Sequence, residues 1–415
     1  MRAATAFAWA LAAALLATGP SAGADDGTGQ WRLRRDEPQA ATQGPLAQAL
    51  ALDPSVVEPV RGRWVTEARW RRSLSLGAGL TATADVAATA VRPDAGATTL
   101  KSRFDELLLT REQGPWALSA GRQVVAWDVG FGFRPNDVVQ QERRLTLVDT
   151  PLQGRPVVML EHFAGDRALS LAWAHPGSGA LAQVPEGREQ ALAGRLYQRL
   201  GDADVHLFAR WGEHTRASLG AATTWVVGEA LSLHASGRVL QRHVASTGPD
   251  DAALYRSDPW QYVARGQAAQ TLVGMTWTSA QRWSVLTELW HDGTARSNAQ
   301  WQAWQARNAG LAELNAPARA LAAQWAWQAA PLAAPQLRRT AALTRLGWQE
   351  GPWQLALDAL WHPADRGRIV TASLVWQGDH NRLTAAWRQV GGPGSALSAQ
   401  LPQRRSAAAE WSWSF

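Results

Sequence analysis

Arginine is the residue type in this sequence that is best suited to bind a ligand. Of the 41 basic residues, only Lys101 is a lysine. A guanidinium group stays charged and forms paired hydrogen bonds with carboxylates and phosphates. Seven arginines recur on the polar faces of alternating segments, beside two carboxylates, Asp358 and Glu410. They either select anions or fill a wet interior with polar side chains. The seven are Arg195, Arg199, Arg210, Arg238, Arg345, Arg382 and Arg388.

A second group of charged residues lies at the end of one alternating segment and in the connection after it. Residues 121–128 read Gly-Arg-Gln-Val-Val-Ala-Trp-Asp, and residues 133–137 read Phe-Arg-Pro-Asn-Asp. Charges of both signs suit a constriction, where they create a transverse field, and equally a rim that faces charged lipid. We expect residues 128–154 to bend inward as a constriction. The charged residues of this region would be Arg122 on the preceding strand end and Arg134, Asp137, Arg143 and Arg144 in the connection.

Histidine and cysteine give no sign of a catalytic or metal site. The nine histidines are scattered over separate segments without the His-x-x-x-His spacing of a metal-binding helix, and the chain has no cysteine. The sequence also lacks a phosphate-binding glycine loop. We therefore expect no enzymatic activity, no metal and no cofactor, although residues from several segments could still assemble a site.

The elements that position these residues are alternating segments of about ten residues. In residues 353–361 every second side chain is apolar, and residues 231–239 and 382–388 follow a similar pattern. This is the length of a strand that crosses an outer membrane at a tilt, whereas strands of soluble proteins are usually shorter. No run of about 20 apolar residues follows residue 24, which argues against a helical membrane protein.

The last segment alternates most clearly. Ala407, Ala409, Trp411, Trp413 and Phe415 alternate with polar or small residues, and the phenylalanine ends the chain. In water such a strand would promote aggregation, which argues against a soluble sheet edge. The segment resembles the C-terminal strand of bacterial outer-membrane β-barrels. This resemblance implies that Trp411, Trp413 and Phe415 are recognised by the barrel-assembly machinery.

Turn lengths predict the topology. Short turns and long connections mostly interleave from residue 99 onward, as in barrels whose short turns face the periplasm. Fifteen strands fit after residue 99, and one long strand in residues 64–91 makes the total 16. The tripeptide Gly77-Ala78-Gly79 offers a turn that would divide this strand, but we prefer one strand. We therefore expect an all-β transmembrane antiparallel barrel of about 16 strands, within a range of 14 to 18, over residues 64–415.

Two regions differ from this pattern. Residues 293–335 are rich in alanine and glutamine with helical spacing, so we expect a helical extracellular loop, either a partial lid or a surface excursion. At the N-terminus, Arg2 precedes an apolar stretch and a small-residue cleavage site, which predicts a signal peptide over residues 1–24. Residues 25–63 would form a periplasmic lead-in. Export makes us expect no nucleic-acid partner despite a pI of about 10.7.

Residues 121–137 look like the Gly-Arg-Gln strand end and Pro-Asn-Asp loop of several proteobacterial porin-like families, including alginate-export-type barrels. The resemblance implies a pore in the outer membrane of a Gram-negative bacterium. We expect a passive channel for small polar or anionic solutes, surrounded by outer-membrane lipid and lipopolysaccharide. The alternative is a structural or secretion-accessory barrel with a closed lumen that binds a partner through its loops. General porins of 16 strands often form trimers, so a homotrimer is one candidate assembly.

The 24 tryptophans fit this interpretation. An amphipathic ring suits the interface between lipid and water, and we expect most of the rings to point outward in two belts. Trp301 and Trp304, in the helical connection, are the expected exceptions. The tryptophans that we place at strand ends are Trp127, Trp211, Trp353, Trp361, Trp376, Trp411 and Trp413.

Overall fold

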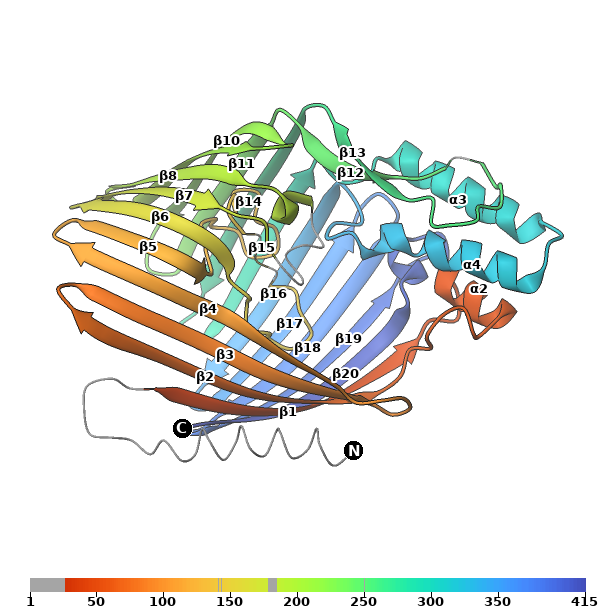
Figure 1. Ribbon diagram of the computed structural model, residues 1–415, viewed down its shortest axis with the longest axis horizontal. Coiled ribbons are helices and arrows are strands. Elements are labelled where there is room, and N and C mark those ends of the chain that lie inside the picture. Colours follow the sequence, from red (N-terminus) through yellow and green to blue (C-terminus); the bar gives the residue numbers. More distant parts are fainter. Residues whose placement is uncertain (1–26, 141, 143, 178–184, 250) are drawn as a thin grey trace.

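The computed structural model describes residues 27–140, 142, 144–177, 185–249 and 251–415, so the expected signal peptide lies outside the described residues. One antiparallel sheet of 18 strands closes on itself as a barrel (Figure 1). The predicted fold is confirmed, and the strand count lies at the upper end of the expected range. The strands are β1 (Thr28–Ala40), β2 (Arg63–Gly77), β3 (Leu80–Pro93), β4 (Thr99–Gln113), β5 (Trp116–Gln123), β6 (Arg155–Ala164), β7 (Arg167–Ala174), β8 (Ala191–Leu200), β9 (Ala203–Gly212), β10 (Arg216–Val226), β11 (Leu231–Leu240), β14 (Ala268–Thr278), β15 (Trp283–Asp292), β16 (Thr340–Glu350), β17 (Trp353–His362), β18 (Gly367–Gln377), β19 (Asn381–Gly391) and β20 (Gln403–Ser414).

The barrel closes between the two ends of the chain. Strand β1 pairs with β2 on one side and with β20 on the other. The backbones of Gly29 and Phe415 exchange two hydrogen bonds, 2.8 and 3.0 Å long. The Phe415 ring lies directly over Gly29 and leaves no room there for a Cβ atom. The C-terminal aromatic residue therefore sits on the seam, where the first and last strands meet.

Two sequence predictions about the N-terminal part are wrong. The barrel begins at Thr28, not at residue 64, because β1 belongs to the wall and is not a periplasmic lead-in. Residues 64–91 hold parts of two strands, β2 and β3, and the turn between them is Gly77-Ala78-Gly79 with φ angles of 84°, 52° and 73°. Glycine adopts this left-handed conformation without strain. These two extra strands raise the total from 16 to 18.

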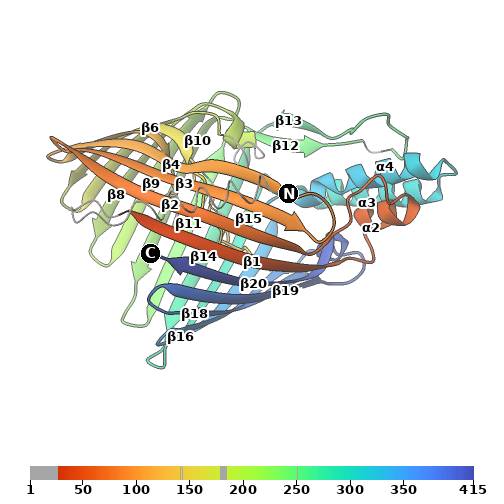
Figure 2. The same cartoon turned by 60° about the horizontal axis from the view of Figure 1, so that its bottom comes forward.

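The two ends of the barrel differ. Short turns join the strands at the end that holds Phe415, which in bacterial barrels is the periplasmic end. At the other end lie three helices, α2 (Pro45–Leu52), α3 (Asn298–Glu313) and α4 (Ala318–Gln328), and a hairpin of β12 (His243–Thr247) and β13 (Gln261–Arg265). Figures 1 and 2 show this group beyond the same end of the wall. The predicted helical loop is thus confirmed.

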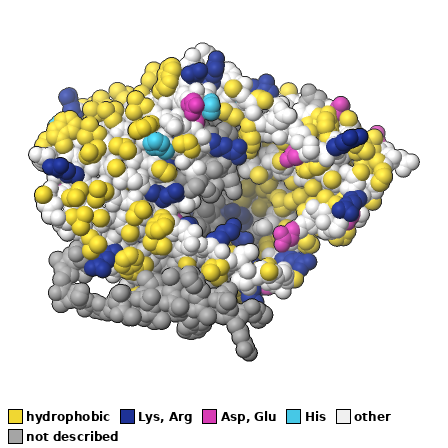
Figure 3. Space-filling view, viewed as in Figure 1, with side chains coloured by type: hydrophobic (Ala, Val, Ile, Leu, Met, Phe, Trp, Pro, Cys, Tyr) yellow, Lys and Arg dark blue, Asp and Glu magenta, His cyan; other side chains and the backbone are white. Residues whose placement is uncertain are grey.

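No helix in the described part of the chain is long and apolar enough to cross a membrane. The outer face of the barrel is instead apolar, as the hydrophobic side chains spread over the wall in Figure 3 show. Eleven tryptophans of the wall strands are among its exposed large side chains, from Trp64 on β2 to Trp411 on β20. Most of them stand near strand ends, where aromatic belts form in outer-membrane barrels. The prediction that Trp127 points outward is wrong, because its side chain is buried inside the barrel and only 8% exposed.

Candidate functional site in a divided lumen

The connection between β5 and β6, residues 124–154, folds into the barrel and is called the inner loop below. Its first part carries four apolar side chains that pack against inward-facing residues of β6 to β10. The wall residues there are small or apolar, which makes room for the loop. This side of the lumen is therefore filled by a packed core. The loop residues are Val125, Trp127, Val138 and Val139, and the wall residues are Val157, Met159, Ala172, Ala174, Ala193, Phe208 and Ala222.

Two side chains, His234 on β11 and Glu288 on β15, hold the tip of the inner loop and are called the bracket below. The fully buried Glu288 carboxylate accepts hydrogen bonds from the backbone N–H groups of Phe131 and Gly132, at 2.7 and 2.6 Å. The same carboxylate lies 2.9 Å from His234 Nε2. Phe133 packs beside the bracket in a cluster with Leu272, Trp290, Ala341 and Leu343. The tip is thus fixed by hydrogen bonds as well as by apolar contacts.

Two predicted constriction residues, Arg134 and Asp137, stabilise the inner loop itself. Asp137 accepts hydrogen bonds from the N–H groups of Trp127 and Asp128, both 3.0 Å long, and from Arg134 Nε at 2.6 Å. Next to them, Asn136 Nδ2 donates to the wall carbonyls of Ala221 and Gly237 and to Ser236 Oγ. Both Arg134 and Asp137 are at most 5% exposed. They are satisfied within the fold.

The returning part of the inner loop, residues 145–150, crosses the other side of the lumen and is called the septum below. Arg388 on β19 donates to the Leu145 carbonyl at 3.1 Å, and Arg32 on β1 donates to the Asp149 carbonyl at 2.6 Å. Between these anchors Val148 packs against Ala386 and Ala408, with Leu147 beside it. Two arginines on different strands therefore hold one thin segment of chain at its ends.

Two large cavities flank the septum. The periplasmic cavity has a volume of about 930 Å³ and is lined by β1 and β14 to β20. The extracellular cavity, of about 950 Å³, is lined by β1 to β4, β18 to β20 and the mouth loops. Thr146, Leu147, Val148 and Thr150 line both cavities. The side of the lumen from β16 through β20 to β4, called the open half below, thus holds two cavities divided by the septum. Strands β6 to β15 enclose the filled half, and the periplasmic ends of β14 and β15 reach the periplasmic cavity.

Positive charge exceeds negative charge in the periplasmic cavity. Arg345 is paired to Asp358 at 2.9 Å but keeps 34% of its side chain exposed, and Arg382 lies 3.7 Å from Asp149 with 39% exposed. Charged groups near water keep part of their field for mobile ions. Five arginines and three carboxylates line this cavity, namely Arg32, Arg144, Arg282, Arg345, Arg382, Asp149, Asp358 and Glu410.

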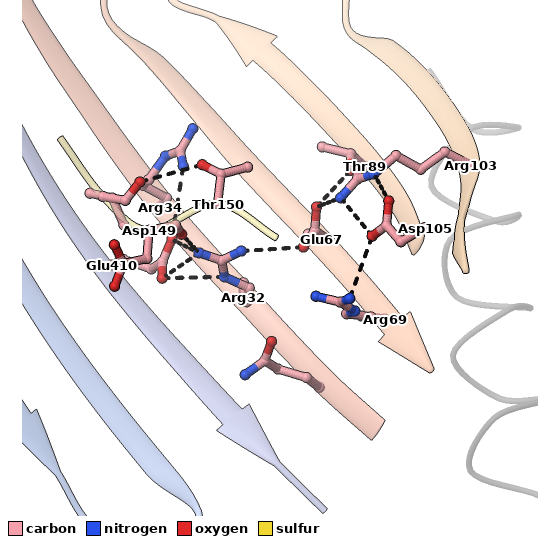
Figure 4. Close-up of polar contacts among 12 residues, drawn as sticks. Arg32, Arg34, Glu67, Arg69, Thr89, Arg103, Asp105, Asp149, Thr150 and Glu410 are labelled. Atoms are coloured by element: carbon pink, nitrogen blue, oxygen red, sulfur yellow. Dashed lines mark hydrogen bonds and ion pairs between the residues drawn. The ribbon is translucent and has the colours of Figure 1, made fainter. Parts of the chain in front are cut away.

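A charged network on β20 and β1 to β4, most of which Figure 4 shows, is the largest feature that the sequence did not predict. Arg32 contacts Glu410 at 2.9 Å and Glu67 at 3.4 Å, and Arg103 bridges Glu67 and Asp105 at 2.9 and 2.7 Å. Arg69 joins Asp105, at 3.7 Å, to the fully buried Asp85. Glu410 was expected on a polar face, but Glu67, Asp85 and Asp105 stand on strands whose alternation is less clear in the sequence. The period-two spacing of Glu67, Arg69 and Arg71 was the available signal.

The structure separates the remaining predicted arginines into distinct groups. Arg144, Arg345, Arg382 and Arg388 line cavities. Arg210 and Arg238 are buried at 3–4% exposure; Arg210 bonds to Glu189, and Arg238 to Ser218 and the Pro135 carbonyl. Arg195 lies over the Trp127 ring, 5.4 Å from its centroid, and Arg199 is exposed beside a periplasmic turn.

Arg122 does not line the lumen, contrary to the prediction. It lies opposite Leu107 in the register and shares the outer face of β5 with Trp116 and Leu118. Gly121, with φ of 136°, directly precedes it within β5. Arg143 lies outside the described residues. Trp411 is 42% exposed on the outer face, and the Trp413 and Phe415 rings lie 4.5 Å apart near the seam.

One carboxylate, that of Asp365, holds together the loops at the extracellular mouth of the open half. Asp365 accepts hydrogen bonds from the N–H groups of Gly367 and Leu397, each 2.9 Å long, and pairs with Arg338. Burial alone would raise the pKa of Asp365, but these donors together hold that pKa below its usual value. Leu397 packs in turn on Trp301 and Trp304, which are buried as expected exceptions to the outward tryptophans. The helical group is therefore tied to the rim.

No group of three or more His, Asp and Glu side chains able to hold a metal occurs among the described residues. His234 and Glu288, 2.9 Å apart, are a histidine–carboxylate pair of the kind that catalytic sites use. Its carboxylate already binds two backbone N–H groups of the inner loop. This pair therefore supports the loop in the present arrangement.

Comparison with solved structures identifies the fold. Acinetobacter baumannii OccAB1 superposes with a TM-score of 0.57 at 8% identity, covering 94% of this chain and 96% of that chain. Pseudomonas aeruginosa OccD3 (OpdP) gives 0.54 at 11% identity over 96% and 92%, and P. aeruginosa OccK8 (OprE) gives 0.52 at 9% over 94% and 98%. The fold is that of a Gram-negative outer-membrane porin. No model of a protein family and no curated protein matches the sequence.

Proposed function

We propose that this protein is a passive outer-membrane channel for small polar or anionic solutes and that its path runs through the open half of the lumen. The observation that carries the proposal is the pair of cavities, about 930 and 950 Å³, that meet at the septum. Each cavity is large enough for a small solute, since ligand pockets span about 300–1,000 Å³. A packed apolar cluster occupies the filled half instead.

The proposed mechanism combines size exclusion with electrostatic attraction. A wet cleft with low-dielectric walls focuses the field of its charged groups and raises the local concentration of the opposite ion. In the periplasmic cavity the exposed guanidinium groups of Arg345 and Arg382 supply this field. Arginine side chains arranged in a ring around a pore give it a preference for anions. Solutes would pass from one cavity to the other across the septum, and this passage would need no cofactor.

Planar-bilayer recording of the purified, full-length mature protein tests this proposal. We expect discrete conductance steps and a reversal potential that favours chloride over potassium in a salt gradient. The preference should weaken at high salt, because the Debye length falls from about 10 Å at 0.1 M to about 3 Å at 1 M. Cation preference at low salt would contradict the arginine-based mechanism, and absence of steps in folded protein would contradict the channel.

The runner-up function is a closed structural or export-accessory barrel that binds a partner through its loops. It is favoured by the extent of charge pairing inside the wall, for example Arg103 with Glu67 and Asp105. A lumen with paired charges and a fixed septum would conduct nothing. Recording from a variant that lacks residues 145–150 distinguishes the two functions, because a silent wild type with a conducting variant identifies a closed barrel.

Three assembly-related expectations remain predictions. Residues 1–24 would direct export, the terminal aromatic residues would be recognised by the barrel-assembly machinery, and a homotrimer is the candidate assembly. The position of Phe415 on the seam supports the second expectation, because the machinery must act before the first and last strands pair. Chemical cross-linking in native membranes tests the trimer.

A further inference from the structure

Arginines project from the outer face of the barrel at the extracellular ends of neighbouring strands. Arg92 on β3, Arg368 on β18 and Arg405 on β20 are all exposed, and Arg35 on β1 lies between them. Their faces follow from the register, because Arg92 lies opposite Trp64 and Arg368 opposite Trp361. The corresponding ends of β7 and β9 carry exposed tryptophans instead. The positive charge is thus concentrated on one arc, from β18 through β20 and β1 to β3.

The arginines stand at the level of the aromatic belt. Trp64 is 45% exposed and Trp361 48% exposed on the outer face. Arg405 is the next outward residue beyond Ala407, which lies opposite the exposed Trp387. Tryptophan belts mark the boundary between hydrocarbon and head groups, and long basic side chains extend from that boundary toward the polar layer. The three guanidinium groups therefore reach the head-group layer of the outer leaflet.

Three of these arginines are free to bind a ligand. The side chains of Arg92, Arg368 and Arg405 make no hydrogen bond or ion pair with the described part of the chain. Arg35 differs, because Asp94 and Glu37 already neutralise it, with Asp94 Oδ2 2.8 Å from its guanidinium. Inside the wall, by contrast, arginines such as Arg103 and Arg69 are paired to carboxylates.

The surface between β18 and β20 leaves space for such a ligand. On the intervening β19, Arg368 lies opposite Gly391 and Arg405 lies opposite Gln389. A Cβ atom at Gly391 would meet nothing within 4 Å. Strands two apart are separated by about 10 Å, so two arginine side chains can converge on one phosphate group across the glycine.

We propose that this arc binds the phosphate groups of a phosphorylated glycolipid of the outer leaflet. Guanidinium groups match phosphate geometry with paired hydrogen bonds, and the apolar wall below the arc would accept the acyl chains. The inference rests on the membrane placement of the barrel and not on conductance. Arg368 and Arg405 form the principal site, and Arg92 extends it on the other side of Arg35.

Native mass spectrometry of the full-length mature protein in detergent tests the proposal, with bisphosphorylated lipid A as the probe. The double variant Arg368→Gln/Arg405→Gln should bind the probe about 25-fold more weakly, because each basic residue near an anionic lipid surface contributes about fivefold. Adding Arg92→Gln should weaken binding by about fivefold more. The matched control is Arg111→Gln/Arg167→Gln, which removes two arginines at the periplasmic ends of β4 and β7 and should leave binding unchanged.

Equal binding of bisphosphorylated lipid A by the wild type and the double variant would overturn the proposal. The proposal would also be overturned if the wild type bound dephosphorylated lipid A as tightly as bisphosphorylated lipid A, because the phosphate would then contribute nothing. The heat-dependent gel mobility of folded barrels confirms that each variant is folded. Bilayer recordings of the same variants keep the two proposals apart, since a silent channel that still binds the phosphorylated lipid contradicts only the proposed function.

Discussion

The two halves of the lumen use the same fold for different purposes. In the filled half, small wall residues such as Ala172 and Ala193 receive an apolar loop, and the result is a packed protein core. In the open half, charged and polar wall residues face two cavities, and only the septum crosses the space. A barrel of 18 strands is wide enough to leave a channel when unfilled. The inner loop therefore narrows a wide barrel to a path along one wall.

The comparison also shows that an inward-facing arginine has no single role. In the filled half, Arg210 and Arg238 are buried and spend their donors on wall and loop oxygens. In the open half, Arg345 and Arg382 keep about a third of their side chains exposed. Exposure to the cavity, and not position on the lumen side, decides which arginine can act on a solute.

The largest effect is expected from a substitution that releases the inner loop in the filled half. Glu288→Ala leaves His234 without its partner and removes the acceptor of the Phe131 and Gly132 N–H groups. Each buried donor that is left without an acceptor costs about 1–3 kcal/mol. We expect a loss of stability of this size in denaturant unfolding from detergent micelles, together with a larger and noisier conductance. Unchanged stability and conductance would show that the bracket does not hold the loop.

A smaller effect is expected at the septum. Arg388→Gln removes the donor to the Leu145 carbonyl, a hydrogen bond of a charged group worth about 1.5–3 kcal/mol. The septum should then fluctuate, and single-channel recordings should show more frequent transitions to a higher conductance. Arg382→Gln is the matched control, because Arg382 faces the Asp149 carboxylate at 3.7 Å and makes no described bond to the septum backbone. Equal gating in both variants would remove Arg388 as an anchor.

The charge of the open half can be changed without disturbing its shape. Arg345→Gln/Arg382→Gln leaves three arginines and three carboxylates in the periplasmic cavity. The anion preference measured from reversal potentials at low salt should fall to near unity, while the conductance changes by less than about twofold, since the field and not the width is altered. Arg199→Gln, at a periplasmic turn, should keep the preference. An unaltered preference in the double variant would place the selective charges elsewhere.

The smallest effect concerns the mouth of the open half. Because the pKa of Asp365 is lowered in the folded state, its contacts stabilise the mouth above its ordinary pKa of 3.8 and are lost as the pH falls through the folded value. Asp365→Asn should therefore speed amide hydrogen exchange in residues 392–402 by about tenfold at pH 6, the loss of roughly one hydrogen bond. The difference from wild type should shrink toward pH 3. A difference that grows with acidity would contradict this sign.

The strands could be predicted where one of their faces meets lipid and is therefore apolar. Residues 353–361 and 407–415 alternate as expected, because one face of each strand meets lipid and the other meets polar groups. Strand β1 was missed, since its outward positions pass from Trp31 and Leu33 to Arg35 and Glu37 as it rises above the apolar band. Charge at the head-group level hides a strand from a search for apolar alternation.

The site was predictable only in part. Residues 128–154 were expected inside the lumen because of their charges, but several of those charges, including Arg134 and Asp137, fold the loop upon itself. The apolar residues that fill half of the barrel carry no local sign of burial, because Val138 and Val139 look the same in a surface loop. Packing against β6 to β10 depends on residues far away in the sequence. Local periodicity cannot report that contact.

The absence of cysteine from the chain permits the most direct test of a path confined to the open half. Thr146→Cys places a thiol on the septum, where both cavities meet, and Ser170→Cys places one on β7 in the filled half, where Ser170 is fully buried. Single-channel current is recorded before and after a bulky, water-soluble thiosulfonate is added. We expect the current through the Thr146→Cys channel to fall by more than about half and the Ser170→Cys current to stay constant. Block at Ser170→Cys with none at Thr146→Cys would contradict the account.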